Sequence, residues 1–263
     1  ETVPSRSPTM GAACSSDGSK KITRAGTTGL LNLSDQKLKK VPKRVLELPK
    51  LRVVNLRSNR ITVLPEKLFS YGEMTSLDVG FNRLMAIPSQ ISNLKKLKRL
   101  ELSGNRIKAL PESLWSLPAI QHLDLSKNAL EGLPIADVKE MMPKLKELDL
   151  SDNKLLQLPD SVGHLSTLET LNLNRNLLVK LPSAMGHLSR IRVLRVKNNR
   201  LSGEGCIPKE LFVDTQVFHI ELGGNPIADG NAYYKLEGFE AYAKRCKEKG
   251  DKQIHGGLAV STA

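Results

Sequence analysis

The chain has 263 residues, of which 40% are hydrophobic but only 4% aromatic, so its core must consist of small branched side chains rather than large rings. The net charge of +13 permits nucleic acid or an anionic membrane as a partner, but neither a recognition helix nor interleaved aromatic residues are visible, and we expect no nucleic-acid binding. No stretch approaches the ~20 apolar residues of a membrane-spanning helix. Three cysteines at unrelated spacings (Cys14, Cys206 and Cys246) argue for a reducing, cytoplasmic compartment.

An acylation motif lies within residues 1–29, which we expect to be a flexible segment. Met10–Ser15, with the sequence MGAACS, matches the N-myristoylation pattern M-G-x-x-x-[ST], and Cys14 stands where a second acyl chain is often added. Acylation of Gly11 requires that Glu1–Thr9, which we expect to be a leader, be absent. So short a pattern also arises by accident, but three cations follow it: Lys20, Lys21 and Arg24.

Positive charge is concentrated just after this segment. Residues 37–67 hold ten Lys or Arg against two Glu. Such a basic end suits an anionic membrane surface beside an acylated amino terminus. The alternative is a solvated face that only aids solubility.

A repeat occupies the middle of the chain. Asparagines recur at spacings of 23, 23, 23, 25, 23, 23 and 26 residues, within the pattern L-x-x-L-x-L-x-x-N-x-L, as in Leu97, Leu100, Leu102, Asn105 and Ile107. Each copy continues into an apolar residue followed by proline. The repeated asparagines are Asn59, Asn82, Asn105, Asn128, Asn153, Asn176, Asn199 and Asn225.

This pattern resembles the leucine-rich-repeat superfamily over residues 30–228, in nine consecutive copies. The resemblance implies an α/β solenoid, a curved horseshoe with a parallel concave sheet, short 3₁₀ or helical segments on the convex side and capped ends. Ile22–Leu30 is the candidate for the amino-terminal cap.

Physical chemistry explains the repeated residues. L-x-L is a short strand whose leucines point inward, and stacked strands form one parallel sheet. The chain then turns where its backbone groups have no water, so an amide side chain that both donates and accepts is needed there. We therefore expect the eight asparagines to form a hydrogen-bonded ladder.

The outward residues of these strands form the candidate binding surface. Four successive repeats carry a carboxylate at the central outward position, and like charges on strands about 4.8 Å apart repel unless a cation lies across them. Farther along, the face becomes basic, which suits a partner segment that is basic at one end and acidic at the other. The alternative is that Leu-Asp-Leu-Ser is a common sequence in this repeat and has no binding role. The candidate residues are Asp78, Glu101, Asp124, Asp149, Asn172, Arg175, Arg195 and Lys197.

Residues 229–252 are expected to form one amphipathic helix that caps the last repeat, with a partner-binding helix as the alternative. Its apolar residues recur at helical spacing, with charges between them. They are Tyr233, Leu236, Phe239, Tyr242, Ala243 and Cys246. Residues 253–263 are expected to be a disordered tail.

The carboxyl-terminal part resembles, more closely, the family of leucine-rich repeat-containing protein 57. The matching segments are Ile207–Leu211, Asp214–Val217, Gly224–Pro226 and Leu236–Phe239 with Tyr242. A Met-Gly start also belongs to this resemblance. It implies a membrane-associated, myristoylated repeat protein without an assigned enzyme activity.

No catalytic, metal-binding or phosphate-loop motif accompanies the five scattered histidines, so we expect no catalytic residue, no metal and no cofactor. The expected function is a monomeric, non-enzymatic adaptor or scaffold that binds a protein through its concave face. We expect its acylated basic end to hold it at the cytosolic face of a membrane. The alternative is a regulatory subunit of a phosphatase or of a small-GTPase signalling complex.

Overall fold

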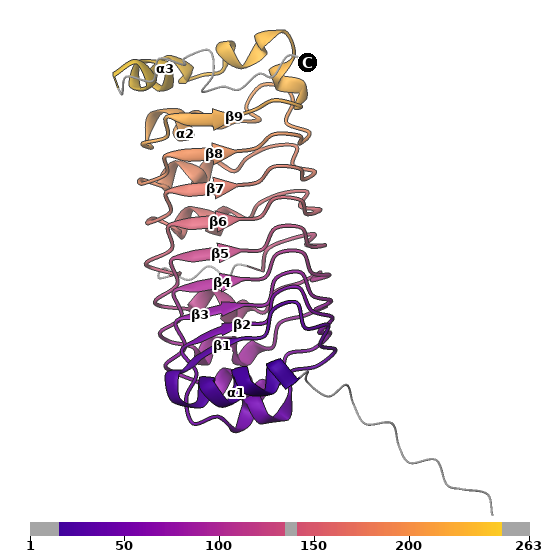
Figure 1. Cartoon of the computed structure of the whole chain (residues 1–263). Helices are drawn as coiled ribbons and strands as arrows, with labels where there is room; N and C mark the ends of the chain where they lie inside the picture. The colour runs from indigo at the N-terminus through magenta and orange to yellow at the C-terminus, as the bar shows by residue number, and fades with distance from the viewer. Residues whose placement is uncertain (1–15, 135–140, 249–263) are drawn as a thin grey trace, which may run out of the picture.

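The computed structural model describes residues 16–134 and 141–248, which stack into a solenoid along one parallel sheet (Figure 1). Within these residues nine strands pair in chain order, which confirms the predicted fold. Neighbouring strands are in register, so that Asn32 lies beside Asn55, and Asn55 beside Asp78. The strands are β1 Leu30–Asn32, β2 Val53–Asn55, β3 Ser76–Asp78, β4 Arg99–Glu101, β5 His122–Asp124, β6 Glu147–Asp149, β7 Thr170–Asn172, β8 Val193–Arg195 and β9 His219–Glu221.

Short 3₁₀ helices form the convex side, as the proline pattern predicts. A proline with φ between −60° and −72° stands directly before η1 to η6. Because proline has no N–H and a φ suited to a helix start, it ends the extended segment and begins the turn. These helices are η1 Lys43–Glu47, η2 Glu66–Ser70, η3 Ser89–Asn93, η4 Glu112–Ser116, η5 Asp160–His164 and η6 Ser183–His187, and α2 Lys209–Val213 takes their place in the next repeat.

Leucine, isoleucine and valine fill the space between the sheet and the convex helices. Leu100 in the middle of β4 and Leu114 of η4 are fully buried, and Trp115, the single tryptophan, is 1% exposed. Since protein interiors are closely packed, truncating such a leucine to alanine costs about 2–5 kcal/mol.

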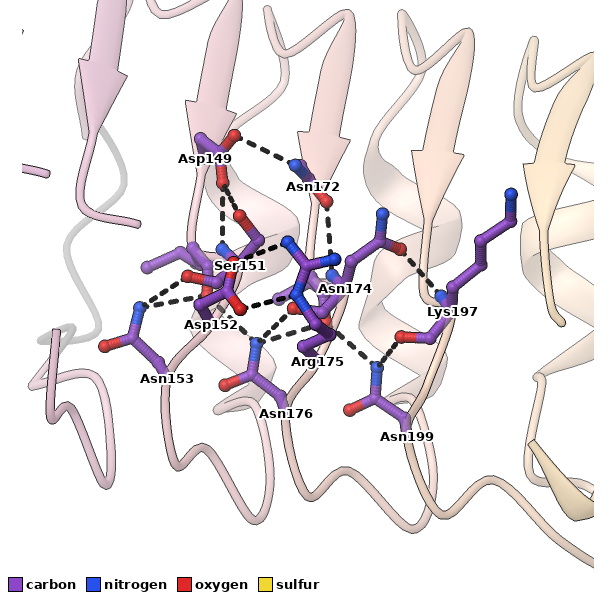
Figure 2. A network of polar contacts seen from close by, with 12 residues as sticks. Asp149, Ser151, Asp152, Asn153, Asn172, Asn174, Arg175, Asn176, Lys197 and Asn199 are labelled. Carbon is purple, nitrogen blue, oxygen red and sulfur yellow. Dashed lines mark hydrogen bonds and ion pairs between the residues drawn. The ribbon is translucent and has the colours of Figure 1, made fainter. Parts of the chain in front are cut away.

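The repeated asparagines bind the turns of adjacent repeats to one another. Asn105 shows the pattern: its Nδ2 donates to the carbonyl oxygens of Val79 (3.1 Å) and Leu102 (2.9 Å). Its Oδ1 accepts from the N–H of Leu84 at 2.9 Å. One side chain thus satisfies buried backbone groups of two repeats. Figure 2 draws three further members of this ladder, Asn153, Asn176 and Asn199.

Helix α1, Ser16–Thr28, closes the amino-terminal end of the solenoid and packs against β1 (Figure 1). Ile22 and Ala25 on its inner face are 2% and 0% exposed. We expected a flexible segment through residue 29. From Ser16 onward the chain is instead helical, because these apolar side chains cover a first repeat that would otherwise expose its core. The acylation residues Gly11 and Cys14 lie outside the described residues.

Two elements close the other end, in place of the single expected helix. They are η7, Pro226–Lys235, and α3, Phe239–Glu248. Between them Gly238 has a φ of +82°, and a Cβ there would lie 3.2 Å from the carbonyl oxygen of Lys209. This left-handed backbone, pressed against α2, interrupts a continuous helix. Most of the expected apolar residues are still buried: Tyr233, Leu236, Phe239, Tyr242 and Cys246. Residues 253–263 lie outside the described part.

Candidate protein-binding surface

The residue at the end of each strand lies on the concave face of the sheet. In each strand the middle residue is buried, and side chains alternate between the two faces of a sheet. In-register pairing stacks the third residues into one column, which we call the central column. Its members are Asn32, Asn55, Asp78, Glu101, Asp124, Asp149, Asn172, Arg195 and Glu221.

A shallow hollow of about 220 Å³ lies on this face over β4 to β8. Four carboxylates and two guanidinium groups are among its lining side chains, so the hollow is acidic although the whole chain carries +13. Its charged lining residues are Arg99, Glu101, Asp124, Glu147, Asp149 and Arg195.

Glu101 lies deepest in the central column, at 9% exposure. Burial raises the pKa of Glu101 to about 7, and the neighbouring carboxylates of Asp124 and Asp78 add to the rise. The guanidinium of Arg99, whose Nη2 lies 2.8 Å from Glu101 Oε1, opposes it. Near neutral pH, therefore, Glu101 carries only part of a negative charge.

Asp124 and Asp149 are held in place by neutral donors. Oδ1 of Asp124 accepts from the N–H of Ser126 at 2.9 Å, and Oδ1 of Asp149 accepts from the N–H of Ser151 at 2.8 Å and from its Oγ at 2.6 Å. Asn172 Nδ2 donates to Asp149 Oδ2 at 2.9 Å (Figure 2). Within 16–134 and 141–248 no cation forms a salt bridge with either carboxylate. Asp124 also shares a side-chain hydrogen bond with Glu101, and the charge of Arg175 acts on Asp149 from a distance. The two half-buried carboxylates are therefore adjacent, and neither is in salt-bridge contact with a cation of the described residues.

The three cations expected to form a basic end are paired within the chain. Arg175 Nη2 donates to Asp152 Oδ2 at 2.7 Å (Figure 2), and this lowers the pKa of Asp152. Arg195 Nε and Lys197 Nζ lie 3.2 Å and 3.4 Å from the carboxylate of Glu221.

The environment of Glu221 reflects its pairing with Arg195 and Lys197. Burial by itself raises the pKa of Glu221, but the hydrogen bonds from His219 and Lys197 and the charges of Lys197 and Arg195 outweigh it and lower the pKa. Stacking thus brings a carboxylate to each of the three cations, and Arg195 and Lys197 share that of Glu221, so the basic character of this end is reduced.

An aromatic residue beside the central column was missed by the sequence analysis. Phe81 is 41% exposed, and the guanidinium carbon of Arg57 lies 4.5 Å from its ring centroid. The sequence does hold a signal, because the residue that precedes each of the other ladder asparagines is polar or glycine.

Nothing in the described ranges assembles a metal site: no group of three or more His, Cys, Asp or Glu side chains there could hold an ion. In the same ranges no helix combines the length and apolar character needed to cross a bilayer.

Comparison with known proteins gives one family match. The family model described as "Leucine rich repeat" matches residues 72–130 and 143–201. A comparison with curated protein sequences finds no match.

Solved structures similar to this chain are solenoids of the same kind. A leucine-rich-repeat protein of Leptospira interrogans is 27% identical, with a TM-score of 0.64, over 78% of this chain and 59% of that one. The ectodomain of the Arabidopsis thaliana receptor kinase GASSHO1/SCHENGEN3, solved in complex with CASPARIAN STRIP INTEGRITY FACTOR 2, is 27% identical, with a TM-score of 0.63, over 76% of this chain and 26% of that one. The effector YopM of Yersinia pestis, at 22% identity and a TM-score of 0.60 over 80% and 58%, shows the fold alone. The chain thus spans less than two thirds of the length of each of these proteins.

Proposed function

This chain is a leucine-rich-repeat protein, and we propose that it is a non-enzymatic adaptor or scaffold whose concave sheet binds a basic segment of a partner protein. One observation carries the proposal. Asp124 and Asp149 stand side by side on β5 and β6, and no cation of the described chain forms a salt bridge with them.

The electrostatics favour a cationic guest. Two carboxylates on strands about 4.8 Å apart repel each other, and an arginine or lysine of the partner placed across them removes that repulsion. The forked guanidinium of arginine suits this spacing because it donates to two oxygens at once. The attraction is local, because the net charge of +13 gives the chain as a whole a long-range field that opposes the approach of a basic peptide.

The comparisons support a binding role of this kind. The Arabidopsis receptor ectodomain, which shares the solenoid, was solved with a bound factor. A continuous concave sheet offers a partner many outward side chains on a rigid support, whereas the convex side is divided into separate short helices.

A labelled basic peptide tests the proposal. Asp124→Asn together with Asp149→Asn removes both charges but keeps the oxygens that accept the N–H groups of Ser126 and Ser151. We expect the double variant to bind a fluorescein-labelled dodecapeptide of alternating Arg and Ser about tenfold or more weakly than the wild type, measured by fluorescence anisotropy.

The matched control changes net charge equally on the convex side. Glu112→Gln with Asp160→Asn, at the starts of η4 and η5, should leave peptide binding unchanged. Equal peptide affinity for the wild type and the concave variant would contradict the proposal.

We further propose that acylation of Gly11, aided by Cys14, holds the protein at the cytosolic face of a membrane. Both residues lie outside the described part, and the support comes from the charge of the adjoining end. A single myristoyl chain binds a bilayer with only ~10⁴ M⁻¹, and each nearby cation adds about 1 kcal/mol against an anionic leaflet. Exposed cations at this end are Lys20, Arg24, Lys37, Lys39, Lys40, Lys43, Arg44, Lys50 and Arg52.

Co-sedimentation tests the tether. Protein made from Met10 with an N-myristoyltransferase should sediment with phosphatidylcholine vesicles that contain phosphatidylserine, and Gly11→Ala should release it. In cells Cys14→Ser should give partial, salt-sensitive release. A chain that retains Glu1–Thr9 is the control, because its Gly11 is not amino-terminal. Equal sedimentation of the wild type and Gly11→Ala would exclude the tether.

A further inference from the structure

A strained position recurs at the rim of the concave sheet, one residue before each ladder asparagine. Ser58, Lys127, Asp152 and Arg175 occupy it with φ between +54° and +56°. Glycine adopts this left-handed backbone most easily, polar residues occupy it in most of the other repeats, and a bulky aromatic residue is unusual there. Phe81 nevertheless occupies it with φ +52°.

The ring of Phe81 lies across the rim toward the next repeat. A Cβ on Gly104 would be only 2.9 Å from Phe81 Cδ1, so the absence of a side chain at Gly104 makes room for the ring. Arg57 stacks on the ring at 4.5 Å, and Lys127 Nζ lies 5.9 Å from its centroid.

The same cluster adjoins the central column. Nη1 of Arg57 lies 3.7 Å from Asp78 Oδ2, and a Cβ on Gly80 would be 2.9 Å from that nitrogen. Phe81 and Arg57 therefore form a rigid shelf at the edge of the acidic face, and Gly80 and Gly104 give it space.

The hydrophobic core does not require this ring. Phe81 remains 41% exposed, whereas core side chains of the same repeat, such as Leu77 and Leu84, are fully buried. A strained, exposed aromatic residue with its own stacking partner indicates a role in binding another protein. The interface residues whose replacement by alanine weakens binding most are often aromatic residues and arginine.

We propose that Phe81 anchors a bulky apolar or aromatic side chain of the same partner segment whose basic side chain binds Asp124 and Asp149. The inference rests on the proposed function. Phe81 belongs to the repeat of β3 and the two aspartates to those of β5 and β6, two to three strand spacings away; with the three-residue step from Asp78 to the rim, the separation is about 10–17 Å. An extended chain covers that distance in about three to five residues.

The shelf selects an apolar guest over a second cation. Arg57 and Lys127 already flank the ring, so another positive charge would be repelled. An apolar side chain instead covers the remaining ring surface and excludes water from it. The partner segment therefore carries a bulky apolar residue and, about three to five residues away, an arginine or lysine.

Selection from phage-displayed random dodecapeptides on the full chain tests this spacing. From the wild type we expect peptides that pair a bulky apolar residue with a basic residue at that distance. Phe81→Ser, which places at the rim the residue that Ser58 already supplies with φ +56°, should select basic peptides without the apolar preference. Phe81→Gly, which places at the rim the residue that Gly104 supplies in the next repeat, should also select basic peptides without the apolar preference. Met85→Ser, in the same repeat and 65% exposed, is the control and should select as the wild type does.

The outcomes separate the two proposals. Basic peptides without an apolar preference from the wild type would overturn the role of Phe81 while leaving the acidic face intact. The same apolar preference from Phe81→Ser would overturn it as well. A wild-type selection without basic enrichment would overturn the proposed function itself, and with it this inference.

Discussion

Replacing Asn225 by alanine should cost more stability than replacing any interior member of the ladder. Asn225 is 1% exposed, its Oδ1 accepts from the N–H of Leu201 at 3.1 Å, and its Nδ2 donates to Val196 and Leu222 at 2.7 Å each. With only the cap as its outer neighbour, Asn225 would be expected to matter less than Asn128. The hydrogen bonds reverse that order.

The difference lies in which backbone groups lose their last partner. When Asn225 is removed, Val196 keeps a bond from Asn199 at 3.0 Å, but Leu201 N–H and the Leu222 carbonyl are left without a described partner. Two buried unsatisfied groups cost about 2–4 kcal/mol together.

At Asn128 the neighbouring asparagines donate hydrogen bonds to the same carbonyl oxygens. Leu102 also accepts from Asn105 at 2.9 Å, and Leu125 from Asn153 at 3.0 Å, so Asn128→Ala leaves only the N–H of Ile107 unsatisfied. The side chain of Asn128 is also partly exposed, and water can reach the site. We expect a loss of about 1 kcal/mol there.

Urea unfolding followed by circular dichroism measures both variants. Fluorescence of Trp115, in the fourth repeat, reports separately on the middle of the solenoid. Because stability in a repeat protein is a sum over neighbours, Asn225→Ala should also unfold its end before Trp115 responds. Equal midpoints for the two variants, or a greater loss for Asn128→Ala, would refute this account of the ladder.

Two further predictions concern buried positions. The pKa of Glu101 is raised from 4.5 to about 7, so the folded state holds this proton more tightly than the unfolded chain does. The stability that protonated Glu101 adds to the folded state is therefore complete below pH 4.5 and is lost as the pH rises through 7. Glu101→Gln should therefore gain stability over the wild type by about 3 kcal/mol between pH 4.5 and pH 8 in urea titrations, and a constant difference would contradict the shifted pKa. Gly163→Ala should lower the free energy of unfolding by about 1–3 kcal/mol because its Cβ would clash with the Ala184 carbonyl oxygen. Gly132→Ala, with nothing within 4 Å, is its control and should have little effect.

Sequence alone was sufficient for the architecture because the fold is built from local units. Each repeat contacts only its neighbours, so the strand leucines, the turn asparagine and the proline before each 3₁₀ helix act within about one period of the chain. Reading one copy, such as Leu100, Leu102 and Asn105, therefore predicted the same geometry for the others.

Charge pairing and the caps depended on the tertiary structure. Arg175 meets Asp152, and Arg195 meets Glu221, only because stacking places residues of adjacent repeats side by side. The sequence placed Asp124 and Asp149 on the candidate surface, but only the tertiary structure shows that Arg175, Arg195 and Lys197 pair with carboxylates while no salt bridge reaches these two aspartates within the described residues.

The ends of the solenoid break the repeat, and there sequence periodicity no longer applies. The shape of each exposed end of the core determines the element that covers it, namely the helix at Ser16–Thr28 and the helices interrupted at Gly238. The deep burial of Glu101 and the exposure of Phe81 are of the same kind, because both follow from the side chains of neighbouring repeats rather than from the residue itself. Solvation and charge at these positions are set by contacts across about 23 residues of chain, the spacing that separates one repeat from the next.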